Sequence, residues 1–303
     1  MKDTTKYHGV FPAFYACYGE NGDVSAERVR SLTRYLLDKG VQGLYVGGSS
    51  GECIYQSVAE RKLVLEQVLL EAKGRAVIIA HVACNNTADS QELAAHAQTL
   101  GVDAIAAIPP IYFHLPEHGI AAYWNDISSA APEMDFIIYN IPQLAGVALT
   151  PSLLREMKKN PRVIGVKNSS MPTQDIQMWR DEDMIVFNGP DEQFISGLAM
   201  GACGGIGGTY GIMPELFLKA REHFLAGRPE QARQIQNDIC RIIYTMCGAR
   251  GNLYAVIKAI LQKNGIDIGG VRKPLPGLSE GDLAIVDKTA ELVDAAIRRH
   301  CRA

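Results

Sequence analysis

Short apolar runs rich in β-branched residues alternate with longer stretches of helical periodicity over the first three quarters of the chain. Eight such runs end in small or polar residues, and they cover residues 9–18, 43–49, 76–83, 104–109, 136–141, 163–168, 184–188 and 204–209. The helical stretches that follow them cover residues 25–39, 57–73, 87–100, 116–131, 150–159, 173–181, 191–201 and 213–226. Strands that alternate with helices of this length predict a parallel sheet.

Eight strand–helix units in succession favour one kind of α/β fold, the closed (β/α)8 or TIM barrel. Residues 227–303 carry helical patterns only, at residues 231–247, 253–262 and 282–299. We therefore predict a barrel catalytic domain over residues 1–226 and a C-terminal helical extension of the same domain over residues 227–303. A doubly wound parallel sheet is the alternative architecture for the same pattern.

The composition narrows the classes of function. The 303 residues are 47% hydrophobic and 21% charged, and the net charge of −3 argues against a nucleic acid or a membrane surface as partner. The seven cysteines include no CxxC pair, so we expect reduced thiols and a cytoplasmic protein rather than a zinc site or disulfides. No apolar run is long enough for a membrane span, and residues 1–10 lack the apolar segment of a signal peptide. Nucleotide-binding glycine motifs and HExxH are absent, so we expect no cofactor and no metal.

A barrel places its chemistry at the C-terminal ends of its strands, where Lys167 closes an apolar run. Because side chains alternate along a strand, Val163, Gly165 and Lys167 are predicted to share the inner face. Ile164 and Val166 are then predicted to pack on the helices. A lysine desolvated at the mouth of a barrel has a lowered pKa and can form a Schiff base. A solvated lysine, or one paired with a carboxylate, is the alternative.

Tyr139 ends the preceding strand with Ile137 on the same face, so its side chain is predicted to lie beside that of Lys167. A tyrosine next to a cationic iminium can carry protons as general acid and base. An aromatic side chain that only lines the barrel is the alternative interpretation.

The Gly-Gly-Ser-Ser-Gly stretch at residues 47–51 has two chemical interpretations. Backbone N–H groups of a glycine turn, with the hydroxyls of Ser49 and Ser50, form a cradle that suits a carboxylate. The stretch also fits G-x-S-x-G, the nucleophile elbow of hydrolases, with Ser49 as nucleophile and residues such as Asp103 and His223 as partners. A purely structural turn is the third possibility.

Two later strand ends carry further candidates. The glycine-rich stretch at residues 204–211 could bind a phosphate or let the backbone approach a ligand closely. Asp191 and Glu192 open a helix, where acidic residues are favourable for electrostatic reasons alone. Their alternative role is hydrogen bonding to substrate hydroxyls.

Five motifs at these strand ends occur together: GGSSGE at 47–52, YNIP at 139–142, GVKNSS at 165–170, NGPDE at 188–192 and GGIGGTY at 204–210. In this combination the chain resembles the dihydrodipicolinate synthase / N-acetylneuraminate lyase family, from about Gly9 to Leu278. The resemblance implies a (β/α)8 barrel with C-terminal helices and a class I aldolase that binds pyruvate on a lysine, commonly as a homotetramer. It assigns the Schiff base to Lys167, the proton shuttle to Tyr139, and a tyrosine lent across a subunit interface to Tyr112.

Within the family, the resemblance favours the lyases. Synthases carry an arginine two residues after the YNxP proline, whereas this chain has Leu144 there, and it shares the acidic pair of the lyases at residues 191–192. The resemblance implies these substrate-binding residues: Ser49, Ser50, Gly48, Ser169, Gly189, Asp191, Glu192, Ile206 and Gly208. Two of them differ from the usual lyase pattern, since Gly208 replaces a frequent serine and Ser169 a frequent threonine.

The reaction that the resemblance implies is reversible cleavage of N-acetylneuraminate to N-acetylmannosamine and pyruvate. The partners would then be small molecules, pyruvate and an amino sugar or sugar acid. One alternative is another pyruvate-dependent aldolase or synthase of the same family, such as an aldolase for 2-keto-3-deoxy sugar acids. The others are a serine hydrolase at Ser49 and a non-catalytic regulator that has kept the barrel.

Overall fold

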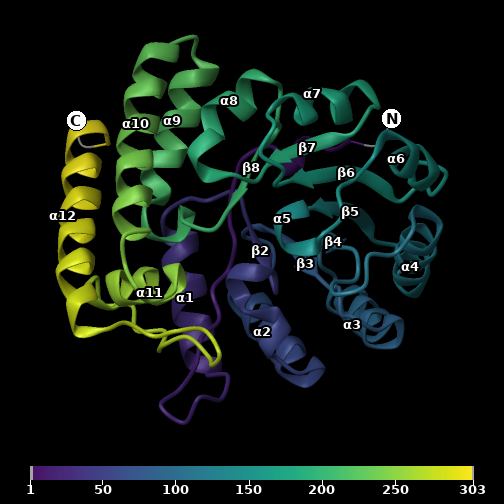
Figure 1. Cartoon of the computed structure of the whole chain (residues 1–303), viewed down its shortest axis with the longest axis horizontal. Coiled ribbons are helices and arrows are strands. Elements are labelled where there is room, and N and C mark those ends of the chain that lie inside the picture. Colours follow the sequence, from purple (N-terminus) through teal and green to yellow (C-terminus); the bar gives the residue numbers. More distant parts are fainter. Residues whose placement is uncertain (1–2, 302–303) are drawn as a thin grey trace.

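Eight parallel strands form a closed barrel in the computed structural model, which describes residues 3–301 (Figure 1). The strands are β1 (Val10–Pro12), β2 (Gly43–Val46), β3 (Val77–His81), β4 (Ala104–Ala107), β5 (Asp135–Asn140), β6 (Val163–Asn168), β7 (Ile185–Asn188) and β8 (Gly204–Gly207). They follow one another in sequence order, β1 pairs with β8, and a bridge between Ala13 and Tyr45 closes the ring. The predicted TIM barrel is confirmed, and the doubly wound alternative is excluded because the strand order never reverses.

Helices cover the outside of the barrel. They are α1 (Ala26–Asp38), α2 (Val58–Ala72), α3 (Thr87–Leu100), α4 (Glu117–Ala130), α6 (Pro151–Met157), α7 (Gln174–Asp181), α8 (Phe194–Ala199) and α9 (Pro214–Leu225). Local signals fix their starts, as at α2, where Ser57 and Glu60 form a capping box. Two details differ from the predicted pattern: a short helix α5 (Pro142–Ala145) follows β5, and Asp191–Gln193 form a 3-10 turn before α8. The ends of the predicted domain ranges, residues 1–2 and 302–303, lie outside the described residues.

Strand β6 departs from regular alternation. Its register with β5 shifts between Phe136 and Ile137, where β6 carries one extra residue. As a result Val163 packs in the outer apolar cluster, between strands and helices, and Ile164 packs in the inner cluster that fills the barrel. The predicted faces of these two residues are therefore wrong. Beyond the bulge the alternation resumes, and Lys167 points inward as predicted, against aromatic rings of the inner cluster.

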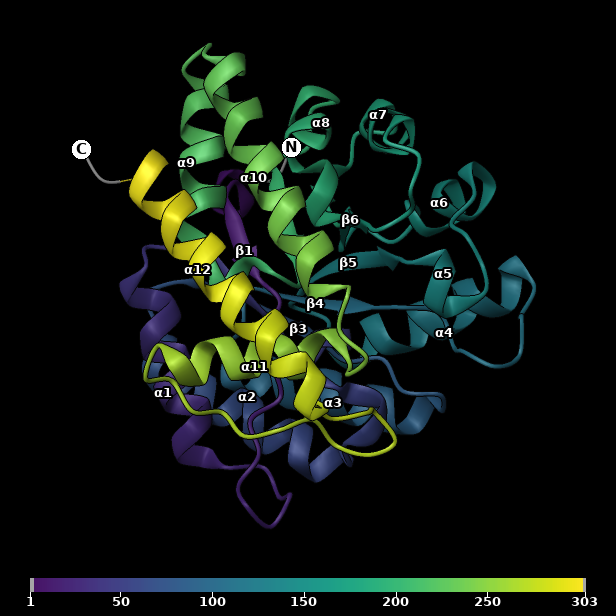
Figure 2. The same cartoon turned by 60° about the vertical axis from the view of Figure 1, so that its left-hand side comes forward.

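The C-terminal extension consists of α10 (Pro229–Met246), α11 (Leu253–Lys263) and α12 (Leu283–His300). Helix α12 packs on both α10 and α11, and α10 packs on α9 of the barrel (Figure 2). Buried residues such as Ile239 of α10 and Ile257 of α11 belong to the outer apolar cluster of the barrel. The extension therefore shares its core with the barrel. Among residues 3–301, no helix combines the length and the apolar character needed to cross a bilayer.

Candidate active site

A cavity of about 330 Å³ opens at the C-terminal ends of the strands, where a barrel places its chemistry. The predicted site residues that line it are Ser49, Ser50, Tyr139, Lys167, Ser169, Gly189, Asp191, Glu192, Ile206 and Gly208. Gly48 is not among these lining residues; it immediately precedes Ser49, and a Cβ there would sit 2.6 Å from the Tyr45 ring. The strand-end motifs, which are far apart in the sequence, thus converge on one cavity.

Lys167 is buried in this cavity, with 4% of its surface exposed. Its Nζ atom lies 4.1 Å from the centre of the Tyr45 ring and 3.9 Å from that of Tyr139. Burial lowers the pKa of Lys167 to about 7, and the negative charge of Asp191 opposes that shift. About half of the molecules then hold an uncharged amine at neutral pH, which is the form that attacks a carbonyl carbon. The alternative of a solvated lysine does not fit this environment.

Tyr139 brings a neutral phenol next to that amine. Burial raises the pKa of Tyr139, the neighbouring Tyr254 adds to the rise, and hydrogen bonds with Ser49 and Ser169 oppose it. The hydroxyl is therefore protonated at rest and has partners with which it can exchange a proton. This arrangement suits a general acid and base acting beside Lys167.

The turn after β2 presents several hydrogen-bond donors to the cavity. Ser49–Gly51 form a 3-10 turn in which the N–H group of Gly51 donates to the carbonyl of Gly48 (3.0 Å). Within residues 3–301, no backbone carbonyl accepts from the N–H groups of Ser49 and Ser50. These two groups, with the two serine hydroxyls, make a set of donors that matches a carboxylate.

The acidic pair after β7 is divided between two environments. Asp191 is buried, and its Oδ2 atom accepts hydrogen bonds from the Thr209 backbone N–H (2.7 Å) and hydroxyl (2.6 Å). Burial raises the pKa of Asp191 to about 7, and these hydrogen bonds oppose the shift. Glu192 lines the same cavity and is only partly buried. Asp191 is thus oriented by the protein, whereas Glu192 is better placed to meet a ligand.

Gly189 and Ser169 touch across neighbouring strand ends. A Cβ at position 189 would lie 2.0 Å from Ser169 Oγ and 2.7 Å from the Asn168 carbonyl oxygen, so only glycine fits. The N–H group of Ser169 donates to the Asn140 carbonyl (2.7 Å), and the buried amides of Asn140 and Asn168 bond to each other (2.8 Å). This network fixes the ends of β5 and β6, and with them Tyr139 and Lys167.

The sequence pattern of the dihydrodipicolinate synthetase family matches residues 6–292. The chain belongs to this family. The N-acetylneuraminate lyase of Mediterraneibacter gnavus is 63% identical over 297 residues, which are 97% of this chain and 94% of that protein. The structure of a catalytic lysine mutant of Ruminococcus gnavus sialic acid aldolase is 62% identical, with a TM-score of 0.98 over 99% of this chain and 100% of that one. CdNal from Clostridium difficile, in complex with mannosamine, is 27% identical, with a TM-score of 0.88 over 99% of this chain and 100% of that one.

Both predictions made from the strand-end motifs are confirmed: the dihydrodipicolinate synthetase family and the resemblance to its lyases. Leu144, which occupies the position expected to be arginine in the synthases of the family, lines the cavity and is 61% exposed. This side chain offers no positive charge to a second carboxylate.

Sequence reasoning missed three residues of the site. Tyr45, whose ring faces Lys167, could have been found, since alternation along β2 places it on the same face as Gly43 and Gly47, just before the Gly-Gly-Ser-Ser-Gly turn. Thr209 belongs to the GGIGGTY motif at residues 204–210, but nothing in the sequence connects it with Asp191. Tyr254 lines the cavity from α11, and no sequence signal linked that helix to the strand ends.

Tyr112 lies outside this cavity. It is 86% exposed, has a positive φ of 81°, and stacks edge-on against Phe113. It lines a separate cavity of about 500 Å³ with Asn85 and Tyr123. An exposed aromatic pair is compatible with a tyrosine lent to a neighbouring subunit of a family tetramer, which stays a prediction.

The partners that a serine hydrolase would need are not brought to Ser49. Asp103 precedes β4, at the opposite end of the barrel, and its Oδ1 atom accepts a hydrogen bond from Lys6 (2.8 Å). His223 lies on α9, where its Nδ1 atom accepts a hydrogen bond from Arg228 (2.8 Å). Neither residue lines the cavity that contains Ser49.

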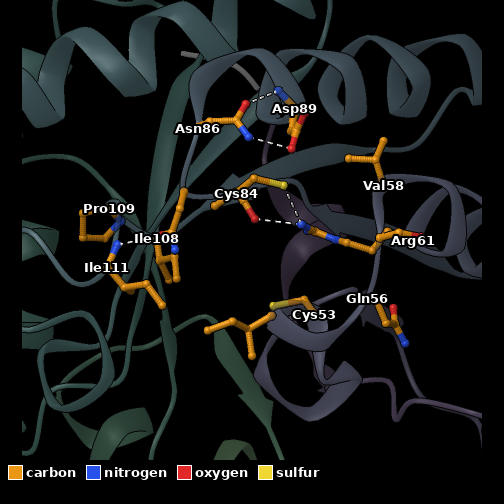
Figure 3. Close-up of a pocket in the computed structure, with 14 residues that line it drawn as sticks. Cys53, Gln56, Val58, Arg61, Cys84, Asn86, Asp89, Ile108, Pro109 and Ile111 are labelled. Atoms are coloured by element: carbon orange, nitrogen blue, oxygen red, sulfur yellow. Dashed lines mark hydrogen bonds between the residues drawn. The ribbon is translucent and has the colours of Figure 1, made fainter. Parts of the chain in front are cut away.

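A third pocket, of about 280 Å³, lies between α2, α3 and the residues that follow Ser49 (Figure 3). Arg61 points into it and donates to the Ala83 carbonyl (2.8 Å) and to the Cys84 sulfur (3.1 Å). Cys53 also lines it, below Cys84 in this view (Figure 3). No lysine lines this pocket, so Schiff-base chemistry belongs to the cavity that contains Lys167.

Proposed function

We propose that this chain cleaves N-acetylneuraminate reversibly to N-acetylmannosamine and pyruvate, as a class I aldolase. The observation that carries the proposal is Lys167, a buried amine with a pKa of about 7 at the mouth of a barrel. The similarity to N-acetylneuraminate lyases over almost the whole chain supports the substrate. The complex of a relative with mannosamine supports an amino sugar as the second product.

In the first step, the uncharged Nζ of Lys167 attacks the 2-keto carbon of the open-chain sugar acid. Loss of water then leaves a protonated Schiff base, in which C2 is joined to Nζ. The free N–H groups and hydroxyls of Ser49 and Ser50 would hold the substrate carboxylate in the turn they form with Gly48. This contact would place C2 against the amine and lower the entropic cost of the attack.

In the second step, the C3–C4 bond breaks and its electron pair moves into the iminium, which becomes an enamine. The Tyr139 phenol gives its own proton to the hydroxide that leaves C2 in the first step, and the resulting phenolate takes the proton of the C4 hydroxyl as that carbon becomes the aldehyde of N-acetylmannosamine. The hydroxyls of Ser49 and Ser169, which bond to Tyr139, would share that proton. Protonation of the enamine at C3 and addition of water to C2 then release pyruvate and regenerate the Lys167 amine.

The sugar end of the substrate would lie along the walls formed after β7 and β8. Glu192 would accept hydrogen bonds from sugar hydroxyls, and Asp191 would hold the wall through Thr209. The backbone at Gly189, Ile206 and Gly208 would line the same path. Glu192 suits a polyol, because a carboxylate is a strong acceptor of hydroxyl donors.

We extend the proposal to the assembly and the domain. The predicted homotetramer would let Tyr112, exposed in this chain, reach the site of a neighbouring subunit. Residues 227–303 would act as part of the same domain as the barrel, since they share its core. A cytoplasmic location remains our proposal for the compartment.

Substrate turnover tests the reaction. Purified protein is mixed with N-acetylneuraminate, and pyruvate is measured by its reduction with lactate dehydrogenase and NADH. The proposal expects pyruvate and N-acetylmannosamine in equal amounts, and no pyruvate from the Lys167→Met variant. A clear preference for 2-keto-3-deoxy sugar acids in the same assay would replace the substrate and keep the reaction class. Ester hydrolysis that is lost in Ser49→Ala, without pyruvate release, would overturn the proposal.

A further inference from the structure

Helix α11 contacts the turn that carries the two serines at two points. The hydroxyls of Ser50 and Tyr254 form a hydrogen bond of 3.2 Å. One helical turn further along, Lys258 Nζ lies 2.8 Å from Glu52 Oε1. Residues four apart lie on the same face of a helix. The same face of α11 therefore contacts both Ser50 and Glu52, two residues apart on the turn.

The Tyr254 hydroxyl lies at the cavity wall beside Gly208. A Cβ at Gly208 would lie 3.7 Å from the Tyr254 hydroxyl oxygen and 3.4 Å from Ser50 Oγ. Tyr254 is partly buried by the packing of α11, and its side chain lines the cavity together with Lys167. Tyr139, the proton carrier, lines the same cavity.

The Ser50–Tyr254 pair has a donor to offer to a ligand. Each hydroxyl has one proton, and the two oxygens share one hydrogen bond, so one proton remains for an outside acceptor. A carboxylate seated on the N–H groups of Ser49 and Ser50 would be that acceptor. In this structure the Ser50 hydroxyl donates to the Tyr254 oxygen. Both hydroxyl protons rotate, so with a carboxylate bound Tyr254 would donate to Ser50 and Ser50 to the carboxylate, a chain in which each hydrogen bond strengthens the next.

The second contact of α11 makes the first one rigid. The side chains of Lys258 and Glu52 are 1% and 0% exposed, and the Gly270 carbonyl (2.6 Å) and the Arg272 N–H (2.9 Å) complete their hydrogen bonds. Such a pair holds one geometry, because leaving either charge alone in the interior is costly. Glu52 also has a positive φ of 52°, a conformation that its surroundings must hold in place.

We propose that Tyr254 is a positioning residue for the keto-acid carboxylate, and that it acts by orienting the Ser50 hydroxyl. The C-terminal extension thereby completes the active site of the barrel. This inference rests on the proposed function, since it concerns the same carboxylate and the same Schiff base.

The test measures only the formation of the Schiff base with pyruvate, without the sugar substrate. Wild type and Tyr254→Phe are incubated with increasing pyruvate and cyanoborohydride, and the fraction of protein carrying an adduct is measured by mass spectrometry. Loss of one hydrogen bond in the chain should raise the half-saturating pyruvate concentration about fivefold. The adduct rate at saturating pyruvate should change less than about twofold. Tyr35→Phe, a half-buried tyrosine on α1 away from the cavity, is the matched control and should behave as wild type.

A second comparison separates positioning from a general loss of structure. In a Ser50→Ala background, Tyr254→Phe should have almost no further effect on pyruvate saturation, because the hydroxyl acts through Ser50. Equal effects in both backgrounds, or unchanged pyruvate saturation in the single variant, would overturn the inference. So would a raised KM for N-acetylmannosamine alone, which would place the hydroxyl at the sugar. Absence of an adduct in the wild type would instead overturn the proposed function.

Discussion

The ionisation of Lys167 predicts how the rate of Schiff-base formation depends on pH. With a pKa of about 7, half of the Lys167 side chains are uncharged at pH 7. An ordinary lysine with a pKa near 10.4 would be uncharged in roughly one molecule in 2,500 at that pH. Burial thus gives the reactive amine an advantage of about a thousandfold at neutral pH. We expect adduct formation to rise with pH, reach half of its maximum near pH 7, and level off above pH 8.

Trapping with cyanoborohydride at a fixed, saturating pyruvate concentration measures this profile. Nα-acetyl-lysine, whose side-chain amine is free, is treated in parallel and serves as the ordinary amine. The Asp191→Asn variant adds a directional check. The charge of Asp191 raises the pKa of Lys167, so its removal should move the midpoint to lower pH. A profile that keeps rising to pH 10, as that of Nα-acetyl-lysine should, would refute the claim that burial activates Lys167.

Three further predictions follow from the same contacts. Lys167→Met should stabilise the fold by a few kcal/mol below pH 7, as measured by urea unfolding, because the pKa of the buried amine lies below its value in the unfolded chain. This gain in stability should vanish as the pH approaches 10. A gain that does not vary with pH would contradict the prediction. Lys258→Met should destabilise the fold by about 3–5 kcal/mol, since it leaves Glu52 buried and alone, and adding Glu52→Gln should recover much of that loss. Gly189→Ala should lower kcat at least tenfold, because the new Cβ would overlap Ser169, and circular dichroism should show that the variant remains folded. A variant that turns over as fast as the wild type would show that the strand ends can separate freely.

The barrel and most of its site could be predicted because local patterns carry them. Alternation along β5 gave the inward direction of Tyr139, and the strand-end motifs gave the residues around Lys167. The bulge in β6 could not be predicted, because the sequence around Val163 and Ile164 alternates in the same way with or without an extra residue. Both residues are apolar, so either face accepts either of them.

The contribution of α11 to the site also escaped prediction. Tyr254 and Ser50 are 204 positions apart in the chain, and their contact depends on how α11 packs against the barrel. The periodicity of residues 253–262 predicted a helix but not which neighbour its face would meet. Asp191 shows the same limit, since only the fold brings Thr209 to its carboxylate. Contacts between distant segments are set by packing, which local patterns do not encode.

The most direct test of the account asks which atom binds pyruvate. The protein is incubated with pyruvate and borohydride, digested, and its peptides are sequenced by mass spectrometry. We predict one reduced adduct, on Lys167, and none in the Lys167→Met variant. An unmodified Lys167, or an adduct on the other deeply buried lysine, Lys258, would contradict the account.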